Sequence, residues 1–355
     1  MHKIAFIIPY LDYFESVGFP QSYDYRCDFS VMASRWYHAG VSGNVSMCSQ
    51  YPDQDDNKTH LVYNYFFLSH PVWGQCIRPP KKQDNIIVFS ECSDYWSKDP
   101  SIKNISSKIS IEYNPTTTNY LKDFSINKNY VNNLVNVFND KKRFTVPLGT
   151  SHELCKKEFN KEKVLLLDEP HKVVLDNLSD KSKQHVFSYE KSLEICKILS
   201  NRGWHIKTFC TRDHQGKFKK IKNKHSWIEI IRFDDLWVPY LEMLNCYKSC
   251  FMFFSHYQET HGFSIYENLQ MGNGLIVFEE NFNPLTIRQF QNGIKLSLYM
   301  NNEICADLVE EYYSALDKNR SNNIADESKE LFSSDTFAKR IRWSLNNLNE
   351  ANVFI

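Results

Sequence analysis

The sequence has no excess of charge of either sign. Lysine and arginine together number 42, as do aspartate and glutamate, so the formal net charge is zero. A neutral chain lacks the long-range field that draws proteins to nucleic acids or to anionic membrane surfaces. Overall charge therefore points to neither class of partner. A local basic patch stays open at "KFKKIKNK" (217–224), which otherwise fits a solvated loop.

The chain also lacks a long apolar run near its start and has no low-complexity tract. Its first apolar run, "KIAFIIPY" at 3–10, is too short for the core of a signal peptide or for a membrane span, and no small-residue cleavage site follows it. We therefore expect a first β-strand, no integral membrane segment and a cytoplasmic protein.

Ten cysteines are present, but none forms a CxxC pair. Cys246 and Cys250 are four residues apart in a helical pattern, a spacing that places both side chains on the core-facing side. This arrangement favours free, buried thiols over a metal site or disulfide bonds.

The 355 residues exceed what one hydrophobic core usually organises, so two domains are expected. Short apolar runs alternate with helix-length amphipathic stretches, which predicts α/β layers with parallel sheets. The expected strands lie at 3–10, 60–69, 85–91, 108–114 and 143–149, and then at 163–170, 205–212, 227–233, 251–254 and 274–280. Helices are expected at 188–204, capped by Ser188 and stopped by Gly203, and at 237–250 and 264–271. We predict domains at 1–155 and 156–330, joined by a polar linker, with a closing helix within 331–355.

One stretch combines the features of a binding site, "FFSHYQETHGFSIYENLQMGNGLIVFEE" at 253–280. Its apolar start predicts a buried strand, Gly262 permits a tight turn, and a helix follows. The backbone N–H groups of Gly262, Phe263 and Ser264 have no acceptor within that helix and lie at the positive end of its dipole. The turn therefore suits an anionic ligand such as a diphosphate, at the strand end where parallel sheets bind ligands.

Two carboxylates flank this turn, and they would repel a phosphate unless each had another task. Glu267 lies about one turn into the helix, within reach of a vicinal diol such as a ribose. Glu259 precedes the turn and can meet a sugar hydroxyl or the reacting centre. A nucleoside diphosphate sugar presents a diol, a diphosphate and a second ring in that order, so this class of ligand explains the layout.

The segment from about Ile231 to Lys295 resembles the donor-binding half of retaining glycosyltransferases of the GT-B fold, the large glycogen-synthase-like and lipopolysaccharide-type group. Their mark is two glutamates separated by seven residues with a glycine near the middle, then a small-residue turn and a strand. Glu259, Gly262 and Glu267 match this mark, and "MGN" precedes the strand "GLIVFEE". "KIAFIIPY" and "RFTVPLGTSHE" resemble the first and last strands of the family's first domain.

The resemblance implies two Rossmann-like parallel-sheet domains that face each other across a cleft, with the acceptor bound by 1–155 and the donor by 156–330. It implies that Glu267 binds the donor ribose and that Glu259 contacts the transferred sugar near its reacting carbon. His261 occupies a position that is often aromatic in the family, and we group it with Glu259 as catalytic, although alone it fits a turn residue. The amides of Gly262 to Ser264 would hold phosphates and sugar. Such enzymes usually need no metal or cofactor, and the donor we expect is a UDP-sugar.

The sequence departs from the family after the first strand of the second domain. Relatives commonly carry Gly-Arg there and a lysine shortly downstream, both on the diphosphate, whereas this chain reads "LLLDEPHK" at 165–172. A carboxylate cannot neutralise a diphosphate, so Arg212, Lys172 or His171 would have to substitute, and we favour Arg212 over Lys172.

The first half offers fewer candidates. The glycine-rich loop that usually follows the first strand is reduced to Gly18, and Glu91 and Asp94 end a strand and either face the cleft or cap a helix. These three are the acceptor-side candidates. "DQD" at 53–55 matches the metal-binding motif of another glycosyltransferase fold, but its place between strands favours a solvated loop.

We therefore predict a retaining hexosyl- or pentosyltransferase that uses a nucleotide sugar, with an envelope saccharide as acceptor. One alternative is a phage-type enzyme that glycosylates hydroxymethylated cytosine in DNA. The abundance of Asn, Lys, Tyr and Phe with few Gly favours it, because this composition is typical of an AT-rich genome such as a viral one. The neutral net charge opposes it. A second alternative is a non-catalytic binding protein that kept the fold, prompted by the missing arginine. The sequence leaves the oligomeric state open.

Overall fold

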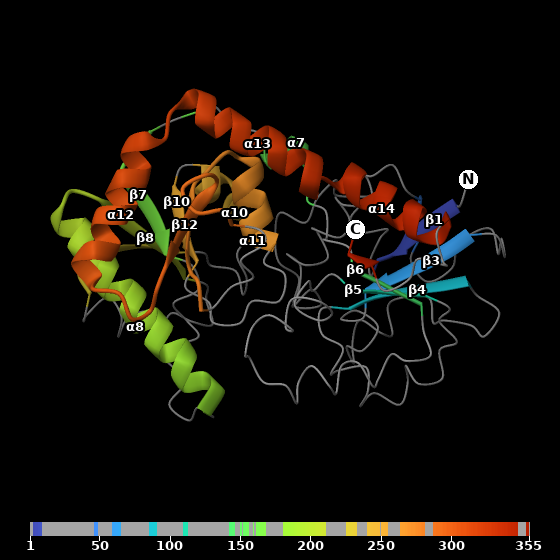
Figure 1. The fold of residues 1–355 in the computed structure, drawn as a ribbon, viewed down its shortest axis with the longest axis horizontal. Helices are drawn as coiled ribbons and strands as arrows, with labels where there is room; N and C mark the ends of the chain where they lie inside the picture. Colours follow the sequence, from blue (N-terminus) through green and yellow to red (C-terminus); the bar gives the residue numbers. More distant parts are fainter. Residues whose placement is uncertain are drawn as a thin grey trace. The chain divides into compact units, whose positions relative to one another are not determined.

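The computed structural model describes a part of the chain, and the fold below refers to that part. The described residues are 3–8, 46–48, 59–64, 85–90, 109–112, 142–145, 150, 152–155, 159, 161–167, 180–210, 225–232, 240–248, 250–254, 263–280, 287–346 and 353–354. They form two compact units, and the chain passes from the first to the second next to residue 152 and returns after residue 330 (Figure 1).

A parallel sheet forms the frame of the first unit. Among the described residues it has seven strands, in the order β13 (Val353–Phe354), β6 (Lys142–Thr145), β5 (Ile109–Glu112), β4 (Asn85–Ser90), β3 (Thr59–Asn64), β1 (Lys3–Ile7) and β2 (Ser46–Cys48). Residues 4–7 of β1 and the following Ile8 are buried, as expected of a parallel strand that is covered on both faces. The five strands predicted in this half are present with shorter bounds, whereas β2 and β13 were not predicted.

The closing helix packs within the first unit. α14 (Ser334–Asn346) carries Phe337, Ile341 and Leu345 on one buried face, as their three- and four-residue spacing predicts. The Phe337 ring lies 5.7 Å from the ring of Phe6 in β1. Helix and sheet therefore share one hydrophobic core.

The second unit is built on another parallel sheet. Its six described strands lie in the order β12 (Gly293–Leu296), β11 (Leu275–Phe278), β10 (Phe251–Phe254), β7 (Val164–Leu167), β8 (His205–Cys210) and β9 (Ile228–Arg232). Following the chain, β8 pairs with β7 and β9 pairs with β8, whereas the next strand, β10, pairs with β7 on the side opposite β8. The strand order therefore reverses between β7 and β10, as in the doubly wound folds that bind nucleotides.

Helices connect these strands. They are α7 (His152–Cys155), α8 (Asp180–Asn201), α10 (Tyr240–Lys248), α11 (Phe263–Gln270), α12 (Asn302–Ala315) and α13 (Lys318–Phe332), the last of which passes from the second unit toward α14. α8 ends as predicted, because Gly203 has φ 87 and the N–H of Trp204 donates to the carbonyl of Leu199 at 3.0 Å. The α/β prediction is thus confirmed in both units.

Three local predictions need correction. Ser188 does not cap α8: the helix begins eight residues earlier at Asp180, and Ser188 is buried inside it. The segment "TSHELCKKEFNKEK" at 150–163, which was predicted as a linker without a helix, contains α7, whose Cys155 is buried and which packs against α10 and α11. Cys250 is buried but follows α10 instead of lying inside it. Cys246 is half-buried, and burial raises the pKa of its thiol to about 11, which keeps it protonated.

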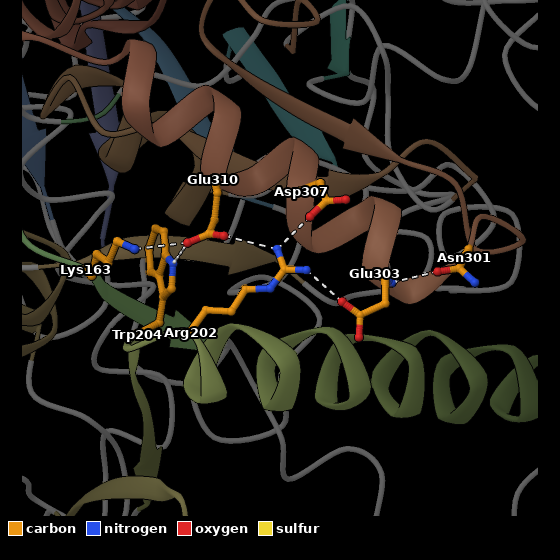
Figure 2. Close-up of polar contacts among 7 residues, drawn as sticks. All are labelled: Lys163, Arg202, Trp204, Asn301, Glu303, Asp307 and Glu310. Atoms are coloured by element: carbon orange, nitrogen blue, oxygen red, sulfur yellow. Dashed lines mark hydrogen bonds and ion pairs between the residues drawn. The ribbon is translucent and has the colours of Figure 1, made fainter.

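α8 and α12 lie beside each other and are joined by a polar network (Figure 2). α12 begins with an N-cap, because Asn301 Oδ1 accepts the N–H of Glu303 at 2.8 Å. Arg202, at the end of α8, donates from Nη1 to Asp307 at 2.7 Å and to Glu310 at 3.1 Å. Its Nη2 donates to Glu303 at 2.7 Å. These bonds raise the pKa of Arg202 above its ordinary value, and the bond to Asp307 makes the largest contribution.

Glu310 accepts hydrogen bonds from two further residues of this network. Lys163 Nζ and Trp204 Nε1 donate to its Oε1 at 3.0 Å and 3.4 Å. Burial opposes ionisation of Glu310, but the hydrogen bonds from Lys163, Arg202 and Trp204 outweigh it, so its pKa lies below the ordinary 4.5. Lys163 and Trp204 directly precede β7 and β8, so the network marks the edge of the sheet at the amino ends of these strands.

We expect Arg202→Met to lower the free energy of unfolding by about 1–2 kcal/mol, because three partly exposed charge-assisted hydrogen bonds are lost together. Urea unfolding followed by tryptophan fluorescence measures this. Lys339→Met, which removes one exposed pair with Asp335 on α14, is the control and should cost less than about 0.5 kcal/mol. Equal losses in the two variants would contradict a cooperative network.

The same network should respond to pH. A carboxyl group whose pKa is lowered by folding stabilises the fold above its unfolded pKa, and this contribution disappears as the pH falls through the folded value. The stability difference between wild type and Glu310→Gln should therefore be largest at neutral pH and shrink below pH 4.5. A difference that stayed constant down to pH 3 would contradict this.

Candidate active site

The predicted site lies where the strand order of the second sheet reverses. β10 pairs with β7 on one side and with β11 on the other, and Phe253 of β10 is in register with Leu167, the last residue of β7. The carboxyl ends of β7 and β10 are therefore neighbours. Two predicted segments continue from these ends along the chain, "DEPHK" from β7 and "SHYQETHG" from β10. In open parallel sheets, a crevice at this position binds ligands.

α11 is the helix that begins beside this edge, and its residues from 265 onward are buried. Glu267, about one turn into the helix, is 0 % exposed. Its Oε1 accepts a hydrogen bond from the hydroxyl of Tyr240, the first residue of α10, at 2.8 Å. A buried carboxylate is costly unless it is hydrogen-bonded, so this contact helps to compensate the burial of Glu267.

Further polar contacts hold α11 in place. The hydroxyl of Tyr247 donates to Ser264 Oγ at 3.1 Å, and Asn273 Nδ2 donates to the carbonyl of Tyr247 at 2.7 Å. Asn268 Nδ2 donates to the carbonyl of Ser264 at 2.8 Å and to Met252 Sδ in β10 at 3.0 Å. α11 is therefore fixed to α10 and to β10 by side chains that are nearly all buried.

The end of α11 is formed by glycine. Gly272 has φ 69, and Ser321 Oγ of α13 donates to its carbonyl at 3.0 Å. The N–H of Gly272 donates to the carbonyl of Leu269 at 2.9 Å. The predicted helix end at Met271 and Gly272 agrees with this geometry, and it is where α13 contacts the site helix.

The structure describes three of the predicted site residues. Phe263 begins α11, Ser264 lies in its first turn and Glu267 follows one turn later. The other predicted site residues lie outside the described part of the chain; these are Gly18, Glu91, Asp94, Lys172, Arg212, Glu259, His261 and Gly262. Their roles stay predictions.

Sequence reasoning missed Tyr240, Tyr247 and Asn273. The two tyrosines are seven residues apart on a predicted helix, a spacing that places them on one face two turns apart. That spacing could have identified them as a buried pair, but it could not identify their partners, because Tyr240 and Glu267 are 27 residues apart. Tertiary packing alone brings these groups together.

In the described parts of the chain, no three His, Cys, Asp or Glu side chains are grouped so as to bind a metal ion. Nor does any helix in them combine the length and apolar character needed to cross a bilayer.

No known protein family matches the chain, and no curated protein matches it in sequence. Solved structures do match its fold. A glycosyltransferase from Rickettsia africae superimposes with a TM-score of 0.55 at 12 % identity, over 99 % of both chains. HepE from Anabaena in complex with UDP-glucose gives a TM-score of 0.53 at 9 % identity, over 97 % of this chain and 99 % of its own. The same protein in complex with UDP and glucose gives the same TM-score and identity, over 98 % of this chain and 100 % of its own.

Sucrose-phosphate synthase from Thermosynechococcus elongatus gives a TM-score of 0.51 at 12 % identity, over 90 % of this chain and 77 % of its own. Such low identities carry information about the fold and not about substrates. Together with the two parallel sheets, these matches show that the chain has the GT-B fold of glycosyltransferases.

Proposed function

We propose that the chain is a glycosyltransferase that moves a sugar from a nucleoside diphosphate sugar to an acceptor hydroxyl. One observation carries the proposal: the strand order of the sheet reverses between β7 and β10, and α11, with Glu267 about one turn from its start, is the next helix along the chain after β10. The GT-B fold supports it, and so do matched structures that contain UDP or UDP-glucose.

In this proposal the donor is a UDP-sugar held by the second unit. The backbone N–H groups at the start of α11 bind the diphosphate, and Glu267 accepts hydrogen bonds from the ribose diol. Because Glu267 is 0 % exposed, neighbouring groups must move apart when the nucleotide binds.

The reaction itself is proposed to retain the anomeric configuration. The bond from the anomeric carbon to the diphosphate breaks, the acceptor oxygen forms a bond on the same face, and its proton leaves with the diphosphate. Glu259 and His261 act at the reacting carbon, while Arg212 or Lys172 and the amides of α11 stabilise the leaving diphosphate without a metal ion. The proposed acceptor is a saccharide.

A panel of nucleotide sugars tests the proposal. We expect one or more of them to raise the thermal unfolding temperature and to release nucleoside diphosphate when acceptor saccharides are added. Nuclear magnetic resonance of the product then gives the anomeric configuration, and inversion would refute the retaining mechanism. If no nucleotide sugar binds or turns over, the glycosyltransferase proposal fails. Retention on duplex DNA that weakens with salt would replace the saccharide by DNA as the acceptor.

A further inference from the structure

Two buried tyrosines of α10 donate hydrogen bonds to two residues of the site helix. Tyr240 and Tyr247 are each 2 % exposed. The Tyr240 hydroxyl donates to Glu267 at 2.8 Å, and the Tyr247 hydroxyl donates to Ser264 at 3.1 Å. Both donors are buried tyrosine hydroxyls, but the bond to Glu267 is buried whereas the bond to Ser264 is partly buried, and the two acceptors differ in charge. One acceptor is the carboxylate proposed to bind ribose, and the other is a neutral hydroxyl.

We infer that Tyr240 is a positioning residue for ribose recognition: its hydroxyl sets the orientation of the Glu267 carboxylate. This inference rests on the proposed function, because it concerns the same site. Tyr240 does not contact the nucleotide in this scheme and acts through Glu267. This role of Tyr240 distinguishes Glu267 from a carboxylate whose orientation depends on its own backbone alone.

The physical argument begins with the freedom of a glutamate side chain. Three torsions separate the carboxylate from the backbone, so an unconstrained group samples several orientations and binding must select one of them. A hydrogen bond from a buried hydroxyl to a carboxylate is stronger than one between neutral groups, so it restricts the carboxylate to one orientation. Tyr240 is the first residue of α10, and its own side chain is buried. The donor is therefore fixed before the nucleotide arrives.

This arrangement has a consequence for specificity. A carboxylate aimed at the ribose diol distinguishes a ribonucleotide from its 2′-deoxy analogue, because only the former presents both hydroxyl groups. If Tyr240 sets that aim, its hydroxyl should matter for UDP and matter little for 2′-deoxy-UDP. A purely structural role would instead weaken the binding of both nucleotides by the same factor.

Titration calorimetry of the full chain with UDP and with 2′-deoxy-UDP tests the inference. We expect the wild type to prefer UDP about 10-fold or more, since a site built to bind a hydroxyl rejects the analogue without it. Tyr240→Phe, which removes one oxygen and keeps the ring, should lose most of that preference, with UDP affinity falling about 10-fold and 2′-deoxy-UDP affinity changing less than about 2-fold. The matched control is Tyr247→Phe, which should change both affinities equally.

A second measurement guards against a folding defect in Tyr240→Phe. In a double-mutant cycle with Glu267→Gln, the losses of UDP affinity should be less than additive, because both substitutions affect the same interaction. Additive losses, or a Tyr240→Phe variant that keeps the wild-type preference for UDP, would overturn the inference and leave the proposed function intact. A wild type that binds UDP without preferring it to the deoxy analogue would also overturn the inference. A wild type that binds neither nucleotide would overturn the UDP-sugar donor of the proposed function, and the inference with it.

Discussion

Glu267→Gln should weaken UDP binding by roughly 10- to 100-fold, because hydrogen bonds to a charged group contribute about 1.5–3 kcal/mol and an amide retains only part of that. The substitution keeps the volume of the side chain and an oxygen that can accept from Tyr240, so the fold should persist. Titration calorimetry gives the affinity, and turnover at saturating donor should fall less than the affinity does.

Glu259→Gln is the companion variant with the opposite expected pattern. If Glu259 acts at the reacting carbon, its carboxylate contributes mainly in the transition state, and turnover should fall by about 100-fold. UDP affinity should stay within about 3-fold of wild type, because the nucleotide itself does not contact this group. Two variants indistinguishable from wild type, or a reversal of the two patterns, would refute the proposed division of roles.

Gly272→Ala should lower the free energy of unfolding by roughly 2–5 kcal/mol, because a side chain here meets two separate obstacles. The residue has φ 69, a conformation that side chains of L-residues rarely adopt. An added Cβ would also lie 2.3 Å from the backbone oxygen of Ser321 and 2.4 Å from its Oγ. Backbone atoms of α13 would have to shift, and the Ser321 hydrogen bond to Gly272 would be strained. Urea unfolding of the full chain measures the loss.

Gly203→Ala separates the two obstacles. Gly203 has φ 87, but no described atom lies within 4 Å of an added Cβ. This variant should therefore lose only the cost of the backbone conformation, about 1–2 kcal/mol. Equal losses at both positions would contradict the close packing of α13 on the end of α11. The comparison needs no knowledge of the ligand, so it tests the fold independently of the proposed function.

The strands were predictable because each parallel strand is buried on both faces and therefore appears as a short apolar run. "KIAFI" and "VLLL" are examples, and the structure places both within the frame of their sheets. Helix ends were predictable where a glycine takes a positive φ, as at Gly203 and Gly272. The start of α8 was not predictable, because its first turn, "DKSKQ", is polar and carries no apolar period.

The site was predictable only in part. The helix of residues 263–270 and the place of Glu267 in it could be read from a local pattern of strand, helix and strand, whereas the turn predicted at Gly262 lies outside the described residues. The contacts that hold Glu267 could not, since Tyr240 belongs to another helix and nothing in its local sequence indicates a carboxylate partner. The network around Arg202 was missed for the same reason, because its carboxylates lie about 100 residues further along the chain.

The sequence by itself thus determined the α/β class, the position of the strands and the helix that carries Glu267, because these depend on the periodicity and backbone preferences of neighbouring residues. Only the tertiary structure decided that β10 returns to the side of β7, and that Glu267 is buried against Tyr240. These features depend on which apolar faces pack together and on which buried polar groups find partners. Such pairings join residues far apart in the chain, and no local pattern specifies them.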